Sequence, residues 1–162
     1  MNAADILKYG HLTVLGTVAA LPDTAWETPG VCGVWSVKNV LAHLASYEAA
    51  IADILASFVG ETATPTLDRM RKQGAAFNDA EVEARSSLSP QQIVDEYAAH
   101  YTRVADLILQ IPAEKRREPG TLPWYGAEYA LDDLLVYMAY GHKREHSAQI
   151  AVFRDKPVAT SR

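Results

Sequence analysis

Two histidines, His142 and His146, stand four residues apart in the segment GHKREHSAQI near the C-terminal end of the sequence. Residues at this spacing in a helix lie one above the other on the same face. At about 100° per residue, both imidazoles fall in the middle of the apolar stripe of a helix predicted at about 130–154. Buried ring nitrogens need partners, and two converging imidazoles can bind one ion. The pair therefore predicts either part of a metal site or two hydrogen-bonded core histidines.

His43 is the candidate for a third ligand, because zinc and similar ions take at least three protein groups. It stands in WSVKNVLAHLASYE, between Val40 and Tyr47, on a second predicted helix. The same arithmetic places it about 75° from the centre of the apolar stripe, toward one edge of the buried face. From there it can reach a neighbouring helix. Three histidines with an open fourth position are the catalytic pattern for a Lewis-acid metal.

Gln149 and Tyr47 are the candidates for residues around such a site, since each stands about one turn beyond a histidine. Either side chain can hydrogen-bond a ligand or orient an imidazole, and ordinary packing is the alternative for both. His11 and His100 lie near apolar stripes and are interpreted as structural or partly exposed residues. Cys32, in the loop before the second helix, is interpreted as a bystander.

The letters HKREH also match H-x-x-E-H, an inverted zinc-protease signature in which Glu145 would be the general base. That architecture takes a third, acidic ligand well downstream. Asp155 is the one acidic residue after His146, so we do not expect a protease.

Long helical patterns separated by proline-rich breaks organise the chain. Ser36 is the predicted N-cap of the second helix, and Ser89, Pro90 and Gln92 form a predicted capping box for a later one. No strand-like alternation of useful length occurs. The predicted helices cover residues of about 3–21, 36–60, 67–85, 89–111 and 130–154. The prediction is therefore an all-α four-helix bundle, with one additional short helix between the second and third long helices.

Length and composition limit the remaining possibilities. A chain of 162 residues, 49% of them hydrophobic, suits one domain, predicted at 1–156, with a tail at 157–162. A net charge of −5 argues against binding to nucleic acid or to an anionic membrane. A single cysteine, no apolar run near 20 residues and no signal-like N-terminus predict a cytoplasmic protein.

Three motifs in this order resemble the DinB/YfiT-like superfamily across essentially the whole chain. They are Trp35-Ser36-Val37 running to His43-Leu44, the AAFN stretch at Phe77-Asn78, and His142-x-x-x-His146. The resemblance implies a four-helix bundle, often a homodimer, with a divalent metal such as zinc or nickel. Its ligands here would be His43, His142 and His146. Some members have a glutamate in place of His142, so this chain has the all-histidine version.

The resemblance also implies a function. Members with enzymatic activity are similar to transferases or isomerases that use bacillithiol, mycothiol or a related low-molecular-weight thiol. The expectation is therefore a metal-dependent enzyme that activates a thiol or water and acts on a small-molecule substrate. The alternative is a non-catalytic bundle that binds a metal or small ligand in a stress response. An enzyme predicts an open metal position beside a roomy pocket, and a binding protein predicts a closed site.

Overall fold

Helix α2 (Val37–Phe58) is the central element of the fold in the computed structural model, which describes residues 2–19 and 21–156. The predicted tail at 157–162 lies outside the described residues. Ser36 caps α2 as predicted: its hydroxyl accepts from the Asn39 amide, while the Asn39 side chain accepts from the Ser36 amide. Such a box satisfies two backbone donors at the helix start. The residues of α2 are buried on almost every side of the helix.

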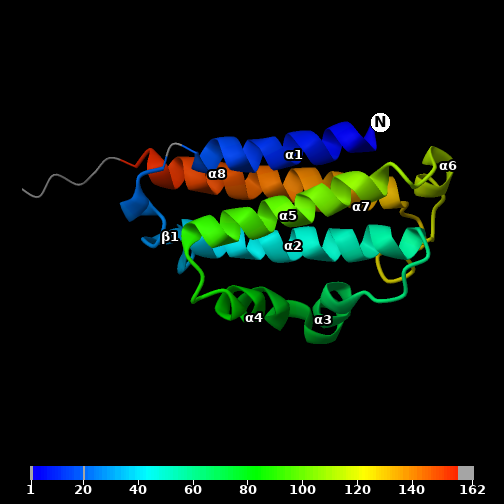
Figure 1. Ribbon diagram of the computed structural model, residues 1–162, viewed down its shortest axis with the longest axis horizontal. Helices are drawn as coiled ribbons and strands as arrows, with labels where there is room; N and C mark the ends of the chain where they lie inside the picture. Colours follow the sequence, from blue (N-terminus) through cyan, green and yellow to red (C-terminus); the bar gives the residue numbers. More distant parts are fainter. Residues whose placement is uncertain (1, 20, 157–162) are drawn as a thin grey trace, which may run out of the picture.

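Three further helical rods complete the bundle around α2 (Figure 1). They are α1 (Ala3–Val18), α5 (Pro90–Ile108) and a composite rod of α7 (Leu131–Leu135), the π-helical segment η3 (Val136–Gly141) and α8 (His142–Arg154). The first rod and the composite rod run in one direction, while α2 and α5 run in the other. The all-α bundle predicted from the sequence is confirmed.

The connection between the parallel helices α2 and α5 returns along the outside of α2 (Figure 1). It contains α3 (Pro65–Gln73), η2 (Gly74–Ala76) and α4 (Phe77–Ala84), where the sequence predicted one short helix. Helix α3 ends before Gly74, whose φ of 56° lies in the left-handed region that favours glycine. The Asp53 carboxylate accepts from the amides of Thr66 and Leu67 at 2.6 and 3.1 Å, which fixes the start of α3 against α2.

A small β-hairpin precedes α2, although no strand-like alternation of useful length occurs in the sequence. Strand β1 (Pro29–Cys32) pairs antiparallel with β2 (Trp35–Ser36) across a turn containing Gly33 at φ 59°. Two and four residues are too few to show a two-residue alternation in the sequence. The first helix ends at Val18, earlier than predicted. Two short helical turns lie in segments predicted as loops: the 3₁₀ turn η1 (Asp23–Ala25) and α6 (Ala113–Arg116).

The core comprises two apolar clusters, both built on α2. One joins α2 to α5, α7 and the start of α1, and the other joins it to the hairpin, the end of α1 and α8. Although α2 is long and apolar enough to cross a membrane, 89% of its most apolar window is buried inside the bundle. This burial marks α2 as the core helix of a helical domain.

Candidate metal centre

His43, His142 and His146 converge at the interface between α2 and α8. The Nε2 atoms of His43 and His142 lie 2.9 Å apart, and those of His142 and His146 lie 3.0 Å apart. The candidate ligand atoms of the three residues all fall within 4.8 Å of one another. Three nitrogens that face a common point at this spacing form a donor set that can hold one divalent ion.

The positions of the histidines differ from the sequence geometry in two respects. His43 is 3% exposed, because other elements cover α2 on almost every side, whereas the sequence placed it toward an edge of the buried face. His142 is only half-buried, and the buried residues of α8 are Lys143, His146, Ser147 and Ile150. The π-helical segment η3 directly precedes His142. A π-helix has a wider turn, so counting a uniform 100° per residue through it gives wrong angular positions for the residues of α8.

Gln149 contacts the cluster through His146, whose Nδ1 lies 2.8 Å from the Gln149 Oε1. A carbonyl oxygen only accepts, so the imidazole donates from Nδ1. In the neutral ring this leaves Nε2 without a proton and directs its lone pair at the other two histidines. Gln149 thereby selects the tautomer of His146 that a metal needs.

Burial keeps the imidazoles neutral. It lowers the pKa of His43 to about 3, helped by proximity to His142 and His146, and the pKa of His142 to about 4, helped by His146 and Lys143. The pKa of His146 is also lowered by burial, against the opposing effects of Gln149 and Glu145. Since a metal binds only the unprotonated nitrogen, all three rings are in the binding form at neutral pH.

Aromatic rings line the cluster. The Tyr47 ring lies 4.6 Å, centroid to centroid, from both His43 and His142, and the Trp35 ring lies 5.1 Å from His43. The Tyr47 hydroxyl donates to Asn78 Oδ1 at 3.3 Å, which connects the cluster to α4. Asn78 was noted in the sequence only as part of the AAFN stretch. These rings restrict the access of water to the histidines on that side.

The other histidines and the cysteine lie outside the cluster. His11 is buried in α1 and stacks on Tyr101 at 3.7 Å between ring centroids. His100 Nε2 lies 3.5 Å from the Glu96 carboxylate, and Cys32 is a half-buried free thiol in β1. Asp155, the acid a protease site would require, is exposed and pairs with Arg154 at 2.7 Å.

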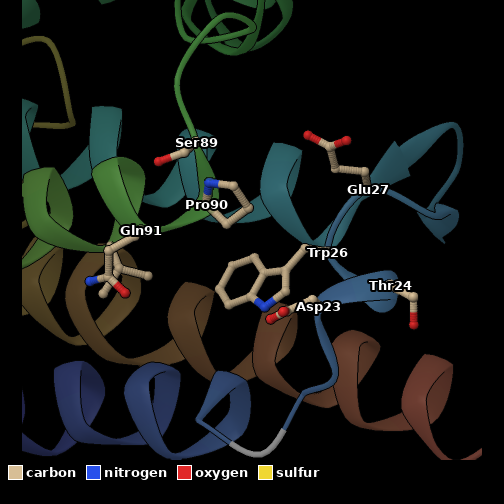
Figure 2. Close-up of a pocket in the computed structure, with 8 residues that line it drawn as sticks. Asp23, Thr24, Trp26, Glu27, Ser89, Pro90 and Gln91 are labelled. Atoms are coloured by element: carbon tan, nitrogen blue, oxygen red, sulfur yellow. The ribbon is translucent and has the colours of Figure 1, made fainter.

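A cavity of about 660 Å³ lies away from the histidines, between the 3₁₀ turn η1 and the start of α5 (Figure 2). Trp26, Asp23 and Ser89 are among its lining residues. A smaller cavity of about 330 Å³ borders the site, because Gln149 lines it together with Phe153 of α8 and Val31 of β1. Its surface is largely apolar, so it suits an apolar part of a small ligand.

A family model, the mycothiol maleylpyruvate isomerase N-terminal domain, matches residues 10–136. The chain belongs to this family. The family is DinB-like, which confirms the resemblance seen in the sequence motifs. No curated protein and no solved structure matches the chain in the corresponding comparisons. The part matched by the mycothiol maleylpyruvate isomerase model includes His43 but ends before His142 and His146. The conclusion that the three histidines form one cluster therefore rests on the distances between them in the bundle.

Proposed function

We propose that this protein binds one divalent metal ion, zinc or nickel, through His43, His142 and His146, and uses it in thiol-dependent chemistry on a small molecule. The observation that supports the metal site is the set of three facing Nε2 atoms. One of the three rings, that of His146, is held by Gln149 in the tautomer whose Nε2 is an acceptor. None of the three ligands carries a charge. A bound dication would keep its full charge and lower the pKa of a thiol or water in its open position.

The thiol part of the proposal is supported by the family, whose name links it to mycothiol and to isomerisation of maleylpyruvate. The protein's own residues would contribute in three ways. Gln149 orients His146, the Tyr47 and Trp35 rings limit water on one side, and the apolar cavity beside Gln149 receives the substrate. An isomerase and an S-transferase both fit this arrangement.

The experiment is an activity screen on zinc- and nickel-loaded protein with mycothiol, bacillithiol and glutathione. Each thiol is supplied with maleylpyruvate, to follow isomerisation by absorbance, and separately with an electrophile such as monobromobimane, to follow thioether formation. The matched control is His142→Ala under the same loading conditions. We expect turnover that needs both metal and thiol and is lost in the control.

A non-catalytic metal- or ligand-binding protein is the second candidate, and one observation favours it. A cavity of about 660 Å³ lies away from the histidines, whereas the cavity that borders Gln149 holds about 330 Å³, near the lower end for ligand sites. Metal-loaded protein that binds a thiol but turns over neither substrate would support this candidate over the enzyme.

A further inference from the structure

A buried ion pair crosses the same interface between α2 and α8 as the histidine cluster. Lys143 Nζ lies 2.5 Å from Glu48 Oε2, and the two side chains are 1% and 0% exposed. It is the most deeply buried ion pair among the described residues. In the sequence, Lys143 is one charge among several in HKREH and was not singled out. Its spacing of seven from Ile150, which is buried, was the signal that it faces inward.

Residues of α1 and α5 surround the pair, and those nearest to it are largely aromatic. Lys143 Nζ lies 5.5 Å from the centre of the Tyr97 ring, and His11 stacks on Tyr97 at 5.0 Å. Burial, together with proximity to Glu48, raises the pKa of Tyr97. A single charge in such a place is strongly unfavourable, so each member of the pair is tied to the other. The pair therefore favours a packing of α2 against α8 that keeps the two side chains in contact.

The pair is adjacent to the histidines in sequence on both helices. Lys143 follows His142 directly and precedes His146 by three residues, while Glu48 follows His43 by five. A rotation of α8 by one residue, about 100°, would remove Lys143 from Glu48 and turn both of its histidines away from His43. The angular position of α8 about its own axis does not follow from that of α7 by uniform α-helical geometry, because the π-helical segment η3 separates the two helices.

We propose that Lys143 and Glu48 are positioning residues that set the rotation of α8 on α2 and so bring His142 and His146 to His43. The inference rests on the proposed metal site and adds residues that touch no metal. Buried ionic groups can specify a unique packing register even where an apolar pair would be equally stable. The site then depends on the pair for its geometry and not for its folding.

The test compares wild type with the double variant Glu48→Leu/Lys143→Met, which replaces the pair by apolar residues of similar volume. The matched control is Arg116→Met/Asp132→Asn, which removes a half-buried pair with a 3.2 Å contact outside the histidine cluster. Three quantities are measured: thermal stability, zinc affinity by chelator competition, and the visible spectrum of bound cobalt. In metal-free protein, imidazole ¹⁵N shifts report the tautomer and order of the three rings.

We expect the double variant to fold with at least 90% of the wild-type helix content, to bind zinc at least tenfold more weakly and to give an altered cobalt spectrum. Its metal-free imidazole shifts should average between tautomers, and the control should match wild type. A double variant with zinc affinity within twofold of wild type overturns the proposal. If that variant does not fold, the swap Glu48→Lys/Lys143→Glu decides: affinity within threefold supports the proposal, and a swap that is unfolded or loses binding overturns it. If wild type binds no metal and its imidazole rings are ordered, while those of the double variant are not, the proposed function is refuted and the positioning role is retained.

Discussion

The Nε2 atoms of His43 and His142 lie 2.9 Å apart, although 99 residues separate the two histidines in the chain. At this distance the nitrogens must share either a proton or a cation, because two bare lone pairs repel. In neutral rings an Nε2 hydrogen on one of the two histidines can serve this contact, whereas burial disfavours a further proton and its positive charge. His146, whose Nε2 acts as an acceptor, adds a third lone pair at 3.0 Å from His142. A metal ion satisfies all three nitrogens at once.

Gln149→Leu should weaken zinc binding about 10–100-fold, because His146 then loses the acceptor that fixes its tautomer. The measurement is chelator competition on metal-free protein. Gln149→Glu keeps an acceptor at the same place and should bind zinc at least as tightly as wild type. Arg144→Gln, an exposed change on the same helix, is the control. Equal affinities for Gln149→Leu and wild type would contradict this role of Gln149.

The free energy of unfolding of the metal-free protein should fall as the pH falls below about 6.5. The pKa values of His11, His43 and His142 are lowered to about 4, 3 and 4 in the folded state, so only the unfolded chain takes up protons in this range. Stability from these residues is complete above about pH 6.5 and is lost as the pH falls to about 4 for His11 and His142 and to about 3 for His43. Between about pH 7.5 and about pH 5 the loss should be at most about 2 kcal/mol per histidine.

Urea denaturation in the presence of EDTA at several pH values measures this dependence. His11→Phe keeps an aromatic ring against Tyr101, lies outside the metal centre and should reduce the pH slope by about one proton. A slope identical in His11→Phe and wild type would show that His11 does not titrate as described.

Gly10→Ala should destabilise the protein by more than about 2 kcal/mol, because two backbones meet there. A Cβ at Gly10 would lie 2.0 Å from the Ala139 carbonyl oxygen, in the π-helical segment η3, and neither backbone can yield easily. Gly16 in the same helix has nothing within 4 Å of its Cβ position. Gly16→Ala is therefore the control and should stabilise by about 0.5–1 kcal/mol. Equal thermal midpoints for the two variants would refute the close contact of α1 with η3.

The sequence predicted the features that depend on strong local signals. The N-cap at Ser36 and the capping box at Ser89 are as predicted, because a cap needs only residues up to three apart. The meeting of His43 with His142 and His146 was anticipated from the spacing of His142 and His146, from the position of His43 at the edge of a second apolar stripe, and from the family resemblance. The π-helical segment was not anticipated, because a single wide turn leaves no periodic pattern in the sequence. Lys143 and Glu48 were missed because a lone charge in a helix usually faces solvent. The homodimer and the cytoplasmic location stay predictions.

Metal content tests the three-histidine site most directly. Wild type, His43→Ala and His142→Ala are purified without a histidine tag and measured by mass spectrometry, with His100→Ala as a control outside the cluster. We expect about one zinc or nickel ion per chain in wild type and His100→Ala, and almost none in the other two variants. Wild-type protein that is empty and takes up neither added zinc nor added nickel would contradict the proposed metal centre.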